Sequence, residues 1–324
     1  MGGVKIIGNL KRREQILRVA RQYYIDGIEQ SQIAKRECIS RTTVSRLLAI
    51  AREEGLVTIT VNDHFRDAQT LANQLMNLYS NVRFTVVSTS QDDQRAKLKR
   101  VAKSAADYLN HSIKSGDIIG LGRGKSILQV AQQLAPKIVR DVEVLLLNGI
   151  FTDPVYQTSS LETASLFSKA YQATLRLLPL PIIFDSLKSK ETVEQESHVR
   201  YVEKLGRVSN IAIFTLDTIQ KNQFLYNKNY FSNDEQKSLS DGAVGEVLSH
   251  FIDIDGQPTV PKIDQRIASI PLESLRYKEH SIVIVYQKAQ VSILSTILRS
   301  GYVNEVFIDQ QSAQLLLGVP YIQN

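Results

Sequence analysis

Short apolar runs alternate with helical stretches from residue 83 onward, and this alternation limits the possible folds more than any other feature of the chain. The runs are rich in Val, Ile, Leu and Phe, a composition typical of strands buried on both faces. The expected strands cover residues 83–87, 118–121, 142–147, 211–214, 281–285 and 305–308. The expected helices cover residues 92–114, 126–134, 161–173, 191–206, 235–251, 288–298 and 311–317. This order predicts an α/β fold with a doubly wound, mainly parallel sheet.

Positive charge gathers at the amino-terminal end of the chain. Residues 1–62 contain eleven Lys and Arg but six Asp and Glu, whereas all 324 residues together have a formal net charge of +6. The first fifth of the chain therefore carries almost the whole excess. A small basic segment beside a nearly neutral body is typical of a protein that binds the phosphate backbone of a nucleic acid through one end.

The composition argues against several classes of protein. The one cysteine, Cys38, excludes an intrachain disulfide framework and a cysteine-built metal site, and fits a reducing compartment. No run approaches the ~18–20 apolar residues of a membrane span, and the first residues lack the apolar core of a signal peptide. The five histidines are scattered, and no GxSxG motif occurs. We therefore expect a cytoplasmic protein that has no contact with the membrane, no catalytic residues and no metal or other cofactor.

The amino-terminal segment has the pattern of a helix-turn-helix. Apolar residues at helical spacing predict a helix over residues 12–25, and a second short helix follows over 30–36. Ser40 is a suitable N-cap for a third helix, whose apolar residues between 44 and 51 fall on one face. Residues 56–61 then alternate like a strand and predict the wing of a winged helix-turn-helix.

The start of the third helix carries side chains suited to DNA. A guanidinium can bind guanine O6 and N7 together, so Arg41 and Arg46 are the expected base or phosphate contacts. The candidate DNA-binding residues are Ser31, Gln32, Ser40, Arg41, Thr42, Thr43, Ser45 and Arg46. One such module binds weakly, so we expect a dimer or tetramer on double-stranded operator DNA. The alternative interpretation is a three-helix docking domain with incidental charge.

The turn before the third helix departs from the usual pattern. An apolar residue followed by Gly or Asn is common there, whereas this chain has Glu37 and Cys38. A residue other than glycine with positive φ costs roughly 1 kcal/mol, so we expect a strained or differently shaped turn. We expect Cys38 to be a small buried side chain rather than a redox sensor.

The chain is expected to divide near residue 62. Residues 1–62 would form the DNA-binding domain, and residues 63–324 would form the effector-binding and oligomerisation domain. A stripe of leucines predicts a linker helix over residues 63–80, which could lie at a dimer interface.

Polar residues follow several expected strands, where ligands bind in sheets of this kind. The loop of residues 122–126 combines backbone N–H groups with two cations at a helix start, which suits a phosphate or carboxylate. It is not a P-loop, because that spacing would place a glycine at Ile119. Residues 241–246 are expected to open a helix. The candidate effector-binding residues are Gly122, Arg123, Gly124, Lys125, Ser126, Asn148, Gly149, Asp217, Thr218, Glu246, Lys288 and Gln290. Together they would suit a small hydroxylated ligand, with or without negative charge, although each loop taken singly fits an ordinary turn.

Several segments resemble the SorC family of bacterial sugar-responsive regulators. They are YYIDGIEQSQIAKRECISRTTVSRLLAIAREEGLVTITV, DIIGLGRGKSILQVAQQL, DGAVGEVLSHFIDIDG and ILRSGYVNEVFIDQQSAQLLL. The segments LETASLFSKAYQ and LPLPIIFD are similar to deoxyribonucleoside-operon regulators of the same family. The resemblance implies a winged helix-turn-helix and an effector domain of the NagB/ribose-5-phosphate isomerase-like type. It also implies an oligomer whose operator affinity changes when a sugar or sugar phosphate binds.

The effector loops depart from the family pattern at several positions. Asn148 stands where a relative that forms a Schiff base has a lysine, and an amide cannot form an imine. Tyr286-Gln287 replaces a common Gly-Gly pair, and Asp217 replaces a glycine and would repel a phosphate. Arg123 and Lys125 add positive charges to the first loop. The ligand therefore does not follow from the family.

The expected function is regulation of a sugar or (deoxy)ribonucleoside catabolic operon. Two alternatives stay open at this point. One is a sugar-phosphate isomerase-like enzyme with an attached helix-turn-helix. The other is a DNA-binding regulator whose effector pocket no longer binds a ligand.

Overall fold

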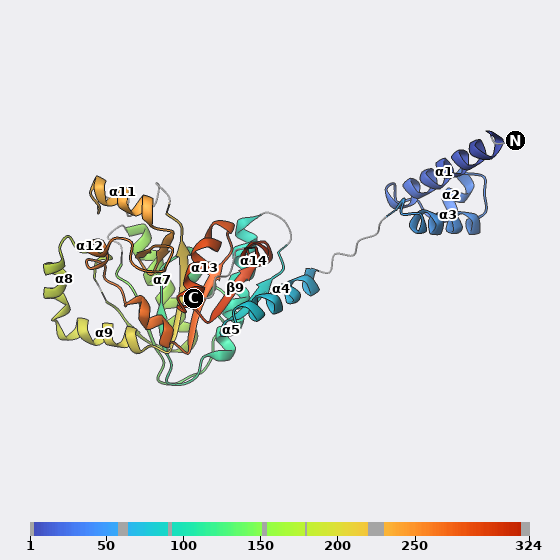
Figure 1. Cartoon of the computed structure of the whole chain (residues 1–324). Helices are drawn as coiled ribbons and strands as arrows, with labels where there is room; N and C mark the ends of the chain where they lie inside the picture. Colours follow the sequence, from blue (N-terminus) through green and yellow to red (C-terminus); the bar gives the residue numbers. More distant parts are fainter. Residues whose placement is uncertain are drawn as a thin grey trace. The chain divides into compact units, whose positions relative to one another are not determined.

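A computed structural model of the chain describes residues 3–57, 64–89, 93–150, 154–178, 180–219 and 230–318. The chain forms two compact units, Met1–Asp63 and His64–Asn324, which are described separately (Figure 1).

Three helices form the amino-terminal unit: α1 (Gly3–Tyr24), α2 (Gln30–Arg36) and α3 (Arg41–Glu53). Their facing sides are apolar, and the spacing of these residues places them on one side of each helix. The buried core consists of Ile16, Val19, Ala20, Ile33, Ala34, Val44, Leu47, Leu48 and Ala51. The helices expected from the sequence are all present, and α1 begins earlier than expected. The expected wing over residues 56–61 falls mostly outside the described residues.

A mainly parallel sheet organises the second unit, as expected from the sequence. Its strands are β1 (Arg83–Val87), β2 (Ile118–Leu121), β3 (Glu143–Leu146), β4 (Thr174–Arg176), β5 (Ile211–Asp217), β6 (Gly245–Val247), β7 (His250–Ile252), β8 (His280–Val285) and β9 (Glu305–Asp309). The order is β1-β9-β8-β5-β2-β3-β4, and all of these strands pair in parallel. The hairpin of β6 and β7 joins the end of β5 in antiparallel fashion.

Helices cover both faces of this sheet, so the fold is doubly wound. The helices are α4 (His64–Leu78), α5 (Gln94–Ser112), α6 (Lys125–Ala131), α7 (Pro154–Tyr171), α8 (Leu187–Glu194), α9 (Ser197–Val208), α11 (Asn233–Gly242), α12 (Pro261–Asp264), α13 (Val291–Arg299) and α14 (Gln310–Leu317), with the 3-10 turns η1 (Leu272–Tyr277) and η2 (Lys288–Gln290). Buried side chains of α5, α6 and α7 form one core with the sheet, and those of α4, α9, α13 and α14 form the other. Successive residues of a strand point to opposite faces. Ile213 and Ile284 accordingly enter the first core, while Phe214 and Val283 enter the second.

Helix α4 belongs to the α/β unit. It packs on β1 and α14 through Ala72 and Leu75, which are buried in the second core. Of the expected leucine stripe, Leu75 is fully buried, whereas Leu78 is 41% exposed. Packing on the sheet therefore explains the burial of Leu75, whereas Leu78 remains exposed to solvent.

The prediction of a single helix over residues 235–251 is wrong. Helix α11 ends at Gly242, and Gly245 begins the β6–β7 hairpin. Residues 241–246 therefore close a helix and open a strand, the reverse of the expected order. A Cβ on Gly245 would lie 2.3 Å from Ile293 Cδ1, so close packing against α13 requires the glycine. The hairpin is stabilised by pairing with β5, a long-range contact that local pattern does not reveal.

Candidate functional site

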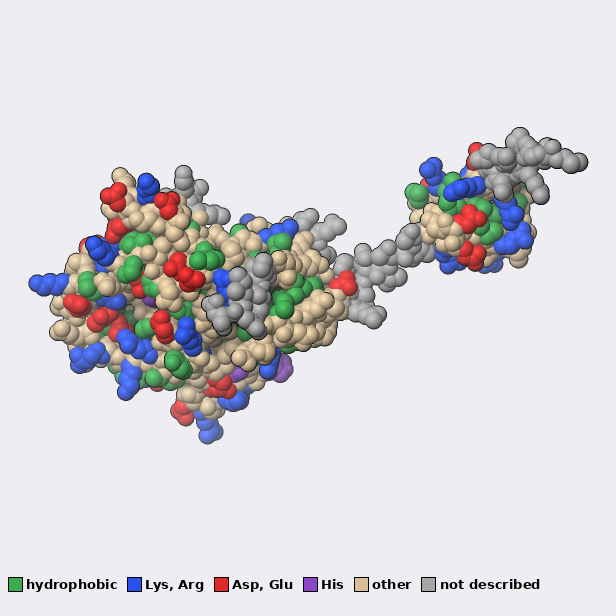
Figure 2. Space-filling model, in the orientation of Figure 1, with side chains coloured by type: hydrophobic (Ala, Val, Ile, Leu, Met, Phe, Trp, Pro, Cys, Tyr) green, Lys and Arg blue, Asp and Glu red, His purple; other side chains and the backbone are tan. Residues whose placement is uncertain are grey.

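The amino-terminal end of α3 presents its polar side chains to solvent. Arg41, Thr42, Ser45 and Arg46 are exposed, and Thr43 is half-buried. In the described part of the chain neither arginine is paired with a carboxylate. Figure 2 shows Lys and Arg side chains at several places on the visible face of this unit. These cations are available to phosphates and base edges.

Ser40 acts mainly as a helix cap. Its Oγ accepts a hydrogen bond from the Thr43 N–H at 3.1 Å and lies 2.7 Å from Thr42 Oγ1. The cap satisfies one of the unpaired N–H groups of the first turn. It thereby fixes the end of α3 that carries Arg41. Ser31 and Gln32 are exposed at the start of α2.

The unusual turn is tied to the first helix. The Glu37 carboxylate accepts hydrogen bonds from Arg18 Nη2 at 2.8 Å and from Gln22 Nε2 at 2.9 Å. The hydrogen bonds from Arg18 lower the pKa of Glu37 below its usual value. Cys38 has φ 53°, so the expected left-handed strain is present. Cys38 is exposed, which corrects the expectation of a buried side chain.

The candidate effector loops meet at the carboxyl ends of β2, β3 and β5. The order of the sheet reverses between β2 and β5, because the chain runs from β2 to β3 and β4 and then returns to β5 on the other side. Ligands of doubly wound sheets bind at such a reversal. Residues 122–126 follow β2, and Asp217-Thr218 follows β5. The structure therefore brings these predicted residues together.

Glycine is required where the first loop crosses β5. Gly124 has φ 136°, and a Cβ there would lie 2.5 Å from Thr215 Cγ2. A Cβ on Gly122 would lie 2.8 Å from Phe214 Cβ. The loop can therefore lie close to β5 only because both residues lack a side chain.

A cluster of three charged side chains joins these loops. One nitrogen of Arg123 lies 3.5 Å from Asp217 Oδ2, and the other end of the guanidinium contacts Glu246 Oε1. The side chain of Glu246 is 3% exposed and that of Arg123 is 19% exposed. Burial raises the pKa of Glu246, and the neighbouring Arg123 opposes this shift. Arg123, which the sequence suggested as a ligand-binding cation, is thus enclosed by two carboxylates.

Asn148 lies beside a turn that sequence reasoning missed. Its Nδ2 donates a hydrogen bond to Ser249 Oγ at 2.8 Å, and both residues are buried. Leu248 and Ser249 join β6 to β7 with φ of 49° and 74°. Two successive residues other than glycine with left-handed backbone conformation store strain, and such strain often marks a functional site. No local signal identifies Ser249, since hairpins with this backbone usually carry Asn-Gly.

His250 continues this buried polar group. Its Nδ1 lies 2.6 Å from Asp264 Oδ1, and its Nε2 lies 2.9 Å from the Ile270 carbonyl. Both ring nitrogens thus lie within hydrogen-bonding distance of oxygen atoms. The histidine orients the hairpin that carries Glu246 and Ser249.

The remaining candidates have different environments. Gln290 is buried, and its Oε1 accepts hydrogen bonds from the N–H groups of Tyr286 and Gln287 while its Nε2 donates to the Leu216 carbonyl. Gln290 therefore supports the loop. Lys125 and Lys288 are exposed, and Gly149 and Thr218 lie at least partly buried in the same region.

Ser126 is fully buried at the start of α6, but its hydroxyl has no partner among the described residues. A buried hydroxyl without a hydrogen bond carries a free-energy cost. A ligand or water at this position would remove that cost.

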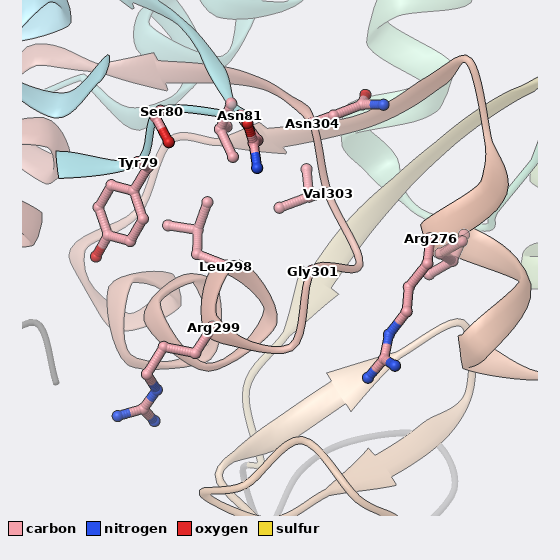
Figure 3. A pocket seen from close by; sticks show the side chains of 11 residues that line it. Tyr79, Ser80, Asn81, Arg276, Leu298, Arg299, Gly301, Val303 and Asn304 are labelled. Atoms are coloured by element: carbon pink, nitrogen blue, oxygen red, sulfur yellow. The ribbon is translucent and has the colours of Figure 1, made fainter. Parts of the chain in front are cut away.

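Two cavities of the α/β unit lie away from these loops. One, of about 460 Å³, lies where β1 and β9 begin, at the other edge of the sheet (Figure 3). Arg276 and Arg299 flank it and donate hydrogen bonds to the carbonyls of Ser300 and Ile254. The other, of about 660 Å³, lies beside β1 and is lined in part by Lys99, Arg100 and Lys103.

In the described ranges, no group of three His, Cys, Asp or Glu side chains is arranged to hold a metal ion. None of the helices described combines the length and the apolar character needed to span a bilayer.

Residues 63–318 match a family model described as "Putative sugar-binding domain". The chain is 35% identical over 307 residues to the deoxyribonucleoside regulator of Bacillus subtilis (strain 168), covering 95% of this chain and 98% of the relative. This relative is of the kind that LETASLFSKAYQ and LPLPIIFD indicated.

Solved structures agree in fold. The full-length sorbitol operon regulator SorC from Klebsiella pneumoniae matches with a TM-score of 0.69 and 23% identity, covering 93% of this chain and 97% of that one. A transcriptional regulator from Streptococcus pneumoniae TIGR4 matches with a TM-score of 0.73 and 20% identity, covering 79% of this chain and 98% of that one. The family model and the relative together show that the chain belongs to the SorC-like family of transcriptional regulators with a sugar-binding domain.

Proposed function

We propose that this protein binds operator DNA through residues 1–62 and regulates a bacterial sugar or (deoxy)ribonucleoside catabolic operon. A small carbohydrate or sugar phosphate bound by residues 63–324 changes its affinity for the operator. One observation supports this proposal above the others. A compact three-helix unit with Arg41 and Arg46 exposed at the start of α3 precedes a segment that matches a sugar-binding family.

The protein acts as a regulator rather than an enzyme, in the cytoplasm and as a homo-oligomer. Support for the first point comes from its relatives, which are named as regulators. Support for the oligomer comes from the small size of the DNA-binding unit, because one such module gains specificity by pairing on a two-fold operator.

To test this proposal, the full-length protein is used to select DNA duplexes from a random pool. Binding of the enriched sequence is then measured by fluorescence anisotropy. We expect a two-fold-related sequence, bound far more tightly than unselected DNA at the same salt concentration. Enrichment of no sequence would contradict operator recognition. Adding carbohydrates to the bound complex then tests whether an effector changes the affinity.

A further inference from the structure

We infer that the effector bound at the carboxyl ends of β2, β3 and β5 is a neutral polyhydroxylated compound without a phosphate group. The inference rests on the proposed function, because it assumes that the effector binds at these loops.

The positive charge best placed to bind a phosphate is already paired. Arg123 contacts Asp217 and Glu246, and the side chain of Asp217 is 37% exposed while that of Glu246 is 3% exposed. These two carboxylates occupy paired positions of β5 and β6, so strand register fixes them together. A phosphate that reached Arg123 would meet both carboxylates. Bringing like charges together in this way weakens binding.

The remaining cations do not offset this repulsion. Lys125 and Lys288 are exposed on the loops after β2 and β8. Water and salt screen exposed charges, so a lysine there attracts a phosphate weakly. The paired charges of Arg123, Asp217 and Glu246, of which only Asp217 is substantially exposed, therefore dominate the choice of ligand.

The same groups are well suited to hydroxyls. A carboxylate has about four lone-pair positions, so Asp217 and Glu246 can accept hydrogen bonds from a ligand while they contact Arg123. The buried Ser126 hydroxyl has no partner among the described residues, and the Asn148 amide is held in place by Ser249. Each hydroxyl of a sugar or polyol both donates and accepts, so it can satisfy groups of both kinds.

Isothermal titration of the full-length protein with matched pairs of ligands tests this inference. The pairs are 2-deoxyribose with 2-deoxyribose 5-phosphate, ribose with ribose 5-phosphate, and sorbitol with sorbitol 6-phosphate. We expect one or more of the free compounds to bind at least about tenfold more tightly than the phosphorylated partner. Tighter binding of the phosphorylated partner would overturn the inference and leave the proposed function intact. Binding of neither member of any pair would count against the effector role itself and so against both.

The substitution Asp217→Asn identifies the residue that excludes phosphate. It keeps the shape of the side chain and removes one negative charge beside Arg123. We expect the preference for the free compound to fall about tenfold. The matched control is Asp107→Asn, which also replaces a carboxylate by an amide. Asp107 is exposed on α5 and is not one of the candidate effector-binding residues. An unchanged preference in Asp217→Asn, or an equal change in Asp107→Asn, would contradict the assignment.

Discussion

The arginines of the two units stand in opposite electrostatic surroundings. Arg41 and Arg46 point into solvent on α3, whereas Arg123 lies between two carboxylates at the end of the sheet. Exposed cations suit a partner that is itself a dense line of negative charge, because each phosphate contact releases counterions. An enclosed cation cannot attract at long range, but it fixes neighbouring oxygens in place. The proposed function therefore uses arginine for charge recognition in one unit and for orientation in the other.

The largest expected effect comes from removing the enclosed cation. Arg123→Ala leaves Glu246 buried without its partner, and breaking such a pair costs about 3–5 kcal/mol. Urea unfolding of the α/β unit within the full-length protein measures this change. The second substitution Glu246→Gln should recover part of the lost stability, because it removes the charge that was left unpaired. A single variant as stable as the native protein would show that the cluster is not coupled in this way.

The same variant should also change the pH dependence of stability. Burial raises the folded-state pKa of Glu246 above its ordinary value of 4.5, and loss of Arg123 raises it further. The folded state then holds a proton that the unfolded state releases, so the free energy of unfolding falls as pH rises above about 4.5. Melting temperatures from pH 4 to 8 should therefore decrease more steeply for Arg123→Ala than for the native protein. In the double variant with Glu246→Gln, the additional decrease of melting temperature with pH should vanish. If this decrease persisted, a titrating group other than Glu246 would be responsible for it.

Removal of an exposed cation should change DNA binding and leave stability nearly unchanged. Arg41→Ala is expected to weaken operator binding by about 1–3 kcal/mol, the usual cost of one good base contact. Anisotropy titrations at fixed salt measure the loss. The control is Arg52→Ala, in the last turn of the same helix, which should have little effect. Equal losses from both variants would indicate attraction without base recognition.

The smallest expected effect lies in the turn that positions α3. Cys38→Gly should stabilise the amino-terminal unit by about 1 kcal/mol, because glycine adopts φ 53° without the clash of a Cβ. Cys38→Ala keeps the Cβ and should give no gain. Thermal unfolding of the two variants, followed by circular dichroism, decides between them. A gain from alanine equal to that from glycine would point to the thiol rather than to the backbone.

Local pattern predicted most of the framework. The six expected strands are all present, and most of them are apolar runs whose side chains enter both cores, whereas the edge strand β1 is only partly buried. The three helices of the first unit follow from their apolar faces and from the Ser40 cap. The β6–β7 hairpin was missed because its short strands depend on pairing with β5, and β4 has three residues at the edge of the sheet.

The candidate site was predicted less completely than the fold. Residues 122–126 and Asp217 were chosen as candidates because ligands bind where parallel strands end, and the structure places them at the ends of β2 and β5. Gln290 was predicted to bind the effector, but its side-chain amide forms hydrogen bonds with the backbone. Ser249 was not predicted, because its contact with Asn148 spans 101 residues of sequence.

The amino-acid sequence alone predicted most of the strands and helices, the basic end of the chain, and the loops that follow the six expected strands. These properties depend on periodicity and composition within short windows. The pairing of Arg123 with Asp217 and Glu246 became visible only in the folded protein, because β2, β5 and β6 become neighbours only when the sheet assembles. Whether a charge is free or paired depends on distance in space, and the order of residues along the chain does not contain that distance.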